Sequence, residues 1–270
     1  MAEARQAQRD QVLFVPGLWL HPASWQPWIE EFVQSGYDCQ IMSWTEESGL
    51  PGAGRASTTP PRADIAQYAH RLRQICESFD RRPVVIGHGL GGLLAETVLT
   101  TGHASAVISL APPPSGAQAI RSCLRGMRRL PGLAALVAWR GPGPPPYERF
   151  APSFAGALPA ADALRVHDTW VVAARPMGVV RWLVRQRRPG RYHSHQQGAP
   201  RGPLLPACGG KDRVVLEADA SDIHRRYRRL FPDSVTDLEV FPDRDHALTV
   251  DNQWLAIAFY CLDWMTAHDL

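Results

Sequence analysis

Short apolar runs alternate along the chain with longer segments of helical periodicity. The runs have the length and composition of buried strands and lie at 12–15, 37–44, 83–88, 106–110, 204–208 and 235–241. The helical segments lie at about 22–34, 62–79, 90–101, 216–230 and 252–268. This alternation predicts an α/β fold with a mostly parallel central sheet and helices on both faces.

The alternation is interrupted between residues 112 and 201. Three prolines at 112–114 end it, and stretches rich in glycine and proline at 141–146 and 198–203 break the irregular helical pattern in between. We therefore expect one core made of residues 1–111 and 202–270, with 112–201 inserted as a mainly helical cap. A chain of 270 residues with 45% hydrophobic content is long enough to bury such a core.

The predicted cap is strongly basic. Residues 112–201 contain fourteen arginines against Glu148, Asp162 and Asp168, whereas the whole chain has a net charge of only +3. A basic lid over a pocket would favour an anionic small molecule, a thioester of coenzyme A or a carrier protein, or an acidic partner. The alternative to a ligand-binding lid is that these arginines form a solvent-exposed face. We expect a small-molecule substrate rather than nucleic acid or a membrane as the partner. The sequence is compatible with a homodimer.

Other features bear on compartment and cofactors. The first ten residues are polar and charged, and the apolar stretch at 130–139 is too short to span a bilayer. Five widely separated cysteines suit a reducing compartment better than a disulfide framework. His193 and His195 are spaced for one face of a strand but lack a third metal ligand. We expect a soluble cytoplasmic protein without a metal or cofactor.

A glycine-rich motif lies where a predicted strand meets a predicted helix. Residues 84–92 read Val-Val-Ile-Gly-His-Gly-Leu-Gly-Gly, with Gly87 and Gly91 two positions on either side of Gly89. This spacing is typical of a nucleophile elbow, a strained strand-to-helix turn that presents its central residue. Because Gly89 has no side chain, the motif predicts an elbow that cannot carry out covalent catalysis at its centre.

An acid and an imidazole follow later strands. Asp212 lies after the run at 204–208, and His246 lies after the run at 235–241. The order elbow, acid, histidine distinguishes the α/β-hydrolase triad from those of other folds. Asp212 could instead only cap the helix that follows it, but its position and spacing favour pairing with His246.

With these motifs the chain resembles the α/β-hydrolase superfamily over nearly its whole length, from Val12 to the last predicted helix. The resemblance implies that Asp212 orients His246, and that the backbone N–H groups of Leu18 and Leu90 form an oxyanion hole. It also implies that Gly89 replaces a serine nucleophile.

The motifs depart from the common family pattern at two places. Pro16 stands where family members commonly have histidine, and Asp245 stands where they commonly have glycine. Neighbouring side chains usually point apart, so we assign Asp245 no direct role. Trp19 and His88 are expected either to line a pocket or to pack in the core.

Three hypotheses for the function remain. The first is an enzyme in which His246, held by Asp212, removes a proton from a carbonyl-activated substrate, leading to elimination, cyclisation or rearrangement. The second is a serine esterase or thioesterase whose nucleophile has been replaced at position 89. The third is a protein that binds a ligand or partner without turning it over.

Overall fold

Six strands form a parallel sheet at the centre of the computed structural model, which describes residues 10–43, 65–115, 139, 141, 143–173 and 201–270. The strand order is β2-β1-β3-β4-β5-β6, and all five pairings are parallel. The strands are β1 (Gln11–Val15), β2 (Asp38–Ile41), β3 (Val84–His88), β4 (Ala106–Leu110), β5 (Leu204–Gly209) and β6 (Glu239–Phe241). The predicted α/β fold with a mostly parallel sheet is thereby confirmed.

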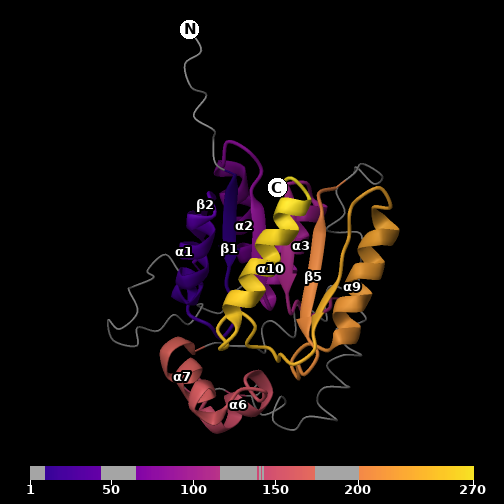
Figure 1. The fold of residues 1–270 in the computed structure, drawn as a ribbon. Helices are drawn as coiled ribbons and strands as arrows, with labels where there is room; N and C mark the ends of the chain where they lie inside the picture. Colours follow the sequence, from indigo (N-terminus) through magenta and orange to yellow (C-terminus); the bar gives the residue numbers. More distant parts are fainter. Residues whose placement is uncertain (1–9, 44–64, 116–138, 140, 142, 174–200) are drawn as a thin grey trace.

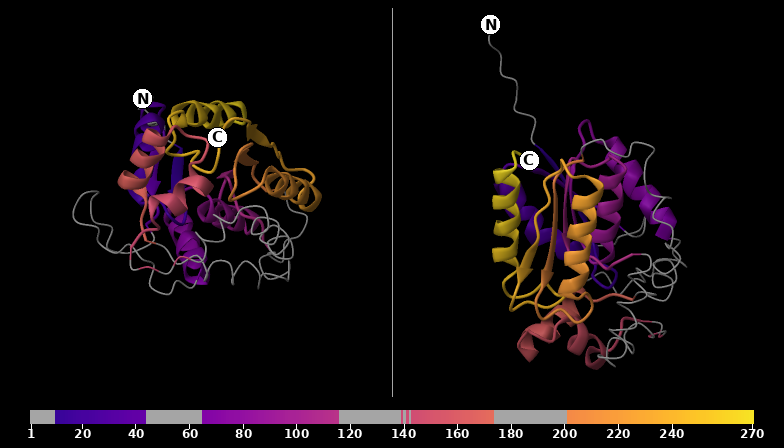
Figure 2. Two further views of the ribbon diagram at one scale, coloured as in Figure 1. Left: turned by 90° about the horizontal axis from the view of Figure 1, so that it is seen from below. Right: turned by 90° about the vertical axis from the view of Figure 1, so that its right-hand side faces the viewer.

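Helices cover both faces of the sheet (Figures 1 and 2). Helices α1 (Gln26–Gln34) and α10 (Trp254–Ala267) contribute buried side chains to one face. Helices α2 (Ile65–Ser78), α3 (Leu90–Thr100) and α9 (Glu217–Leu230) contribute them to the other. In the described part of the chain, no helix combines the length and apolar character needed to cross a membrane.

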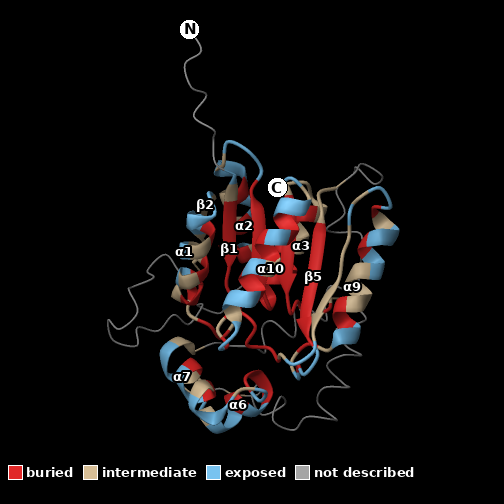
Figure 3. Ribbon diagram, in the orientation of Figure 1, coloured by how far each residue is buried: buried red, intermediate tan, exposed pale blue. Residues whose placement is uncertain are grey.

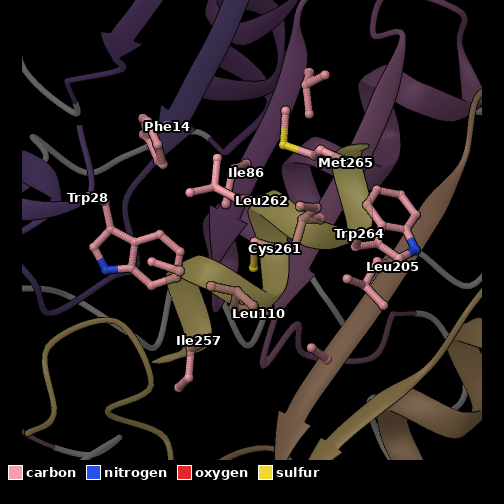
Figure 4. Packing of buried hydrophobic residues seen from close by; sticks show 14 of the residues in the cluster. Phe14, Trp28, Ile86, Leu110, Leu205, Ile257, Cys261, Leu262, Trp264 and Met265 are labelled. Atoms are coloured by element: carbon pink, nitrogen blue, oxygen red, sulfur yellow. The ribbon is translucent and has the colours of Figure 1, made fainter. Parts of the chain in front are cut away.

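The way the core is packed explains why the strands can be predicted from the sequence. Along β1, Val12 and Phe14 join the cluster under α1 and α10, whereas Leu13 and Val15 join the cluster on the opposite face. Figure 4 shows the first cluster, in which Phe14 lies near Trp28, and Figure 3 shows that the central strands are buried throughout. A strand with helices on both sides is apolar at every position, so it appears as a continuous hydrophobic run.

Three predicted elements differ from those observed, and of the described residues in the run at 37–44 only Asp38–Ile41 forms a strand. The run at 235–241 yields only the three half-buried residues of β6, because an edge strand has a partner on one side, and an isolated bridge joins Leu204 to Thr236. The helix predicted from residue 22 is a 3₁₀ turn (Pro22–Trp25) followed by α1. Pro27 is tolerated in the first turn of α1 but would break the interior of a longer helix.

Helices α6 (Tyr147–Phe154) and α7 (Ala160–Trp170) lie beyond the carboxyl ends of the strands (Figure 1). The end of α7 is joined to the loop after β1: the His21 N–H donates to the Trp170 carbonyl at 2.8 Å, and the Val172 N–H donates to the Trp19 carbonyl at 2.9 Å. Residues 116–138, 140, 142 and 174–200 of the predicted cap, which include His193 and His195, lie outside the described residues.

Candidate active site

A sharp turn joins β3 to α3 at Gly89. This residue has φ 53° and ψ −120°, and its N–H donates to the Leu110 carbonyl at 2.8 Å. Residues with side chains rarely adopt such a positive φ. A Cβ atom on Gly87 would clash with the Gly91 carbonyl, and one on Gly91 would clash with the Val15 carbonyl. The glycines therefore allow α3 to approach the ends of β1 and β3 closely.

Position 89 faces the imidazole of His246. A Cβ atom built on Gly89 would lie 3.5 Å from Nε2 of His246 and 3.9 Å from Cα of Gly17. These are ordinary van der Waals distances, so a small side chain would fit the space although the backbone disfavours it. The turn thus directs position 89 at the imidazole.

The loops after β5 and β6 bring Asp212 and His246 together. Because the carboxyl ends of neighbouring parallel strands meet at one edge of the sheet, the two loops lie side by side, and the Lys211 N–H donates to the Arg244 carbonyl at 2.8 Å. Nδ1 of His246 is 2.8 Å from Oδ2 of Asp212, and both side chains are buried.

The second oxygen of Asp212 is also engaged. Oδ1 accepts hydrogen bonds from the backbone N–H groups of Val214 at 2.7 Å and Val215 at 2.9 Å. These donors hold the carboxylate in one orientation and leave Oδ2 to accept the Nδ1 proton of His246. In the neutral imidazole the lone pair is then on Nε2, the atom that faces Gly89.

His88 lies next to His246 but cannot serve as a base. Its Nε2 is 2.9 Å from the carbonyl oxygen of His246, so this nitrogen carries the proton and donates it. Its Nδ1 is buried without a hydrogen-bond partner among the described residues, and a Cβ atom on Gly17 would lie 2.5 Å from it. Burial lowers the pKa of His88 to about 3, so the ring stays neutral near pH 7.

Aromatic residues surround the imidazole of His246. Phe154 of α6 packs edge-on against it with ring centroids 4.7 Å apart. The centroid of the same phenyl ring lies 6.4 Å from that of Trp19 and 6.0 Å from that of His88. Trp19 is buried, and its indole N–H has no partner within the described chain. Nothing in the sequence singles out Phe154, because this contact joins distant segments.

The predicted oxyanion donors flank the turn at Gly89. Leu90 is the first residue of α3, where backbone N–H groups lack an acceptor within the helix. Leu18 follows Gly17, whose Cα is 3.9 Å from the Cβ position on Gly89. Their joint role as an oxyanion hole stays a prediction.

Two hollows are lined by described residues, and neither has Gly89, Phe154 or His246 in its wall. One, of about 220 Å³, includes Ala157, Leu158 and Asp245 in its wall. The other, of about 430 Å³, lies between α7 and the start of α10. Neither includes Trp19 or His88, so their role as pocket lining stays a prediction. Among the described residues, no group of three or more histidine, cysteine or acidic side chains could hold a metal ion.

A parallel sheet with a glycine turn between its third strand and the following helix, and with an acid and a histidine after two later strands, defines the α/β-hydrolase architecture. The model of the alpha/beta hydrolase family matches residues 12–258. The chain therefore belongs to the α/β-hydrolase family, whose members are generally enzymes.

Solved structures of several enzymes share the fold. Polyneuridine aldehyde esterase has a TM-score of 0.60 at 14% identity, with 95% of this chain and 99% of that chain covered. A monoacylglycerol lipase from Paleococcus ferrophilus has a TM-score of 0.63 at 17% identity, with 97% and 95% covered. Tomato methylketone synthase I, complexed with 2-tridecanone, has a TM-score of 0.57 at 14% identity, with 96% and 99% covered. A search of the curated proteins by sequence finds no match.

Proposed function

We propose that this chain is an enzyme in which His246, oriented by Asp212, acts as a general base in non-hydrolytic chemistry on a carbonyl-activated small molecule. The observation that carries the proposal is the position of Gly89. A Cβ atom there would be 3.5 Å from Nε2 of His246, yet residue 89 has no nucleophile to activate. An oriented base that faces no nucleophile is suited to removing a proton from a substrate.

The remaining groups suffice for proton transfer. A positioned general base typically contributes a rate factor of about 10² to 10⁴. The backbone N–H groups of Leu18 and Leu90 would stabilise the negative charge of an enolate as they would that of a tetrahedral adduct. The reaction then proceeds by elimination, cyclisation or rearrangement, with the proton carried by Nε2 of His246.

The substrate class follows from the surroundings. Phe154 and Trp19 supply apolar contacts near His246, and the arginine-rich segment 112–201 favours an anionic or thioester-linked molecule. Methylketone synthase I, a synthase with the same fold, is known in complex with 2-tridecanone, a long-chain ketone. That complex supports a carbonyl compound with an apolar chain as the first substrate to test.

Hydrogen–deuterium exchange provides the test. The protein is incubated in D₂O with ketones, β-keto acids and acyl thioesters, and loss of the protons next to the carbonyl is followed by NMR. We expect exchange that His246→Ala abolishes. The control, His70→Ala, removes an exposed imidazole on α2 and should leave the exchange unchanged. Exchange that persists undiminished in folded His246→Ala would refute the proposal.

The structure also favours a second candidate, an esterase or thioesterase with its serine replaced. A serine hydroxyl at residue 89 would be one bond beyond a Cβ atom that already lies 3.5 Å from Nε2 of His246. The hydroxyl would therefore come within hydrogen-bonding reach of the base. Restoring the serine distinguishes the two candidates.

A further inference from the structure

The carboxylate of Asp245 links two segments that are far apart in the sequence. Its Oδ2 accepts a hydrogen bond from the backbone N–H of Ala157 at 2.7 Å, and its Oδ1 accepts one from the N–H of Ala247 at 3.0 Å. Ala157 lies in the turn between α6 and α7, and Ala247 directly follows His246. One buried side chain thus ties that turn to the backbone on both sides of His246.

The turn that Asp245 binds also fixes Phe154. This residue ends α6, three positions before Ala157, and its ring packs edge-on against His246. The His246 loop is therefore contacted at two neighbouring points: the turn after α6 donates a hydrogen bond to Asp245, and Phe154 at the end of α6 packs against the imidazole.

One other described hydrogen bond from the core reaches α6: the exposed Arg213 side chain donates to the Pro152 carbonyl at 3.3 Å. The Asn252 amide donates to Asp162 at 3.1 Å in an exposed position, and His21 is bonded to Trp170 at the far end of α7. The last two links hold α7, whereas the buried Asp245 bonds the turn that directly follows α6.

The hollow of about 220 Å³ borders this hydrogen bond. Its wall includes Ala157, Leu158 and Asp245. If the bond to Asp245 were lost, the turn would therefore have room to move, and water could replace the carboxylate as partner of the Ala157 N–H.

We propose that Asp245 is a positioning residue that couples α6 to His246 and so sets how Phe154 covers the imidazole. The inference deepens the proposed function, because it rests on His246 being the base. Burial raises the pKa of Asp245, the direction expected of a carboxyl group held away from water.

The first test is Asp245→Asn, which keeps the volume but has one acceptor oxygen for two N–H groups, so at least one of the bonds to Ala157 and Ala247 is broken. We expect amide exchange in the turn containing Ala157 to accelerate about 10-fold to 100-fold. We also expect the NMR signals of the His246 ring protons to shift as Phe154 moves. The matched control is Asp243→Asn, the same change at an exposed residue paired with Lys211, and it should alter neither.

The second test removes the donor instead of the acceptor. Ala157→Pro deletes the N–H, and the preceding Gly156 tolerates the restriction that proline imposes on its neighbour. This variant should shift the His246 ring signals as Asp245→Asn does, and combining the two should add little, since both break one bond. The same readouts on Ala157→Pro decide the matter if Asp245→Asn fails to fold.

Two outcomes would overturn the proposal. One is unchanged His246 ring signals and turn exchange in both folded single variants, and the other is additive effects in the double variant when Asp245→Asn alone accelerates turn exchange. These readouts need no substrate, so they are independent of the deuterium exchange that tests His246 as a base. Coupling without substrate exchange would refute the proposed function and leave the role of Asp245 in holding α6 intact.

Discussion

Residue 89 and His246 face each other across a gap that one small side chain would fill: a Cβ atom on Gly89 would lie 3.5 Å from Nε2 of His246. The turn at Gly89 therefore points at an imidazole whose Nδ1 is 2.8 Å from Oδ2 of Asp212. This relationship makes the chemistry at position 89 testable by one substitution.

Gly89→Ser should give the protein esterase or thioesterase activity if the remaining groups are arranged for acyl transfer. The serine would receive its activation from His246, so Gly89→Ser with His246→Ala should be inactive. Initial rates on short-chain esters and acyl thioesters measure the effect. A folded Gly89→Ser protein without activity would argue against the replaced-serine candidate and direct the search to substrates that lose a proton.

Asp212→Asn should abolish base catalysis without unfolding the protein. The asparagine oxygen can still accept from Val214 and Val215, but its NH₂ group then faces Nδ1 of His246. The imidazole would move its proton to Nε2 and present no lone pair towards position 89. We expect substrate deuterium exchange to fall by about 10² to 10⁴. Circular dichroism should show an intact fold, and unchanged exchange would contradict the role of Asp212.

The sequence predicts most of the sheet because of how its strands are buried. β3 and β4 have a partner on each side and helices on both faces, so their predicted and observed limits differ by at most one residue. β6, at the edge, is half-buried, and its predicted run was too long. Burial on both faces produces a continuous apolar run, and an edge strand lacks this burial.

Only the part of the site that lies in loops at the ends of strands can be predicted from the sequence. Asp212 and His246 follow neighbouring strands, so the topology alone brings their loops together. The bond between Asp245 and Ala157 joins residues 88 positions apart, and Phe154 reaches His246 from the same distant segment. No local periodicity encodes such contacts, and the assignment of no direct role to Asp245 overlooked its link to α6.

Gly89→Ala should lower the thermal stability modestly. Backbone strain in an alanine at φ 53° lowers the free energy of unfolding by on the order of 1 to 3 kcal/mol. The lower conformational entropy of alanine in the unfolded chain raises it by about 0.4 to 1 kcal/mol. The net loss corresponds to a fall in Tm of roughly 2 to 4 °C per kcal/mol. Gly143→Ala, where a Cβ atom would contact nothing, is the control and should not lower the Tm. An equal or higher Tm for Gly89→Ala would contradict the strained turn.

Glu96 on α3 should make the protein less stable as the pH rises. Its Oε1 is buried without a hydrogen-bond partner among the described residues, and burial raises the pKa of Glu96 to about 8. Between its ordinary pKa of 4.5 and this value, the folded protein retains a proton that the unfolded chain has lost. The free energy of unfolding therefore decreases with pH across that window.

Glu96→Gln should remove this dependence, because the amide needs no proton to be buried. Thermal unfolding from pH 4.5 to 8.5 would show the variant gaining Tm over the parent protein as the pH rises, with the largest difference near pH 8. Glu30→Gln, the same change at an exposed residue of α1, should have the same Tm as the parent protein at every pH. Parallel curves for Glu96→Gln and the parent would show that the proton on Glu96 is not linked to folding.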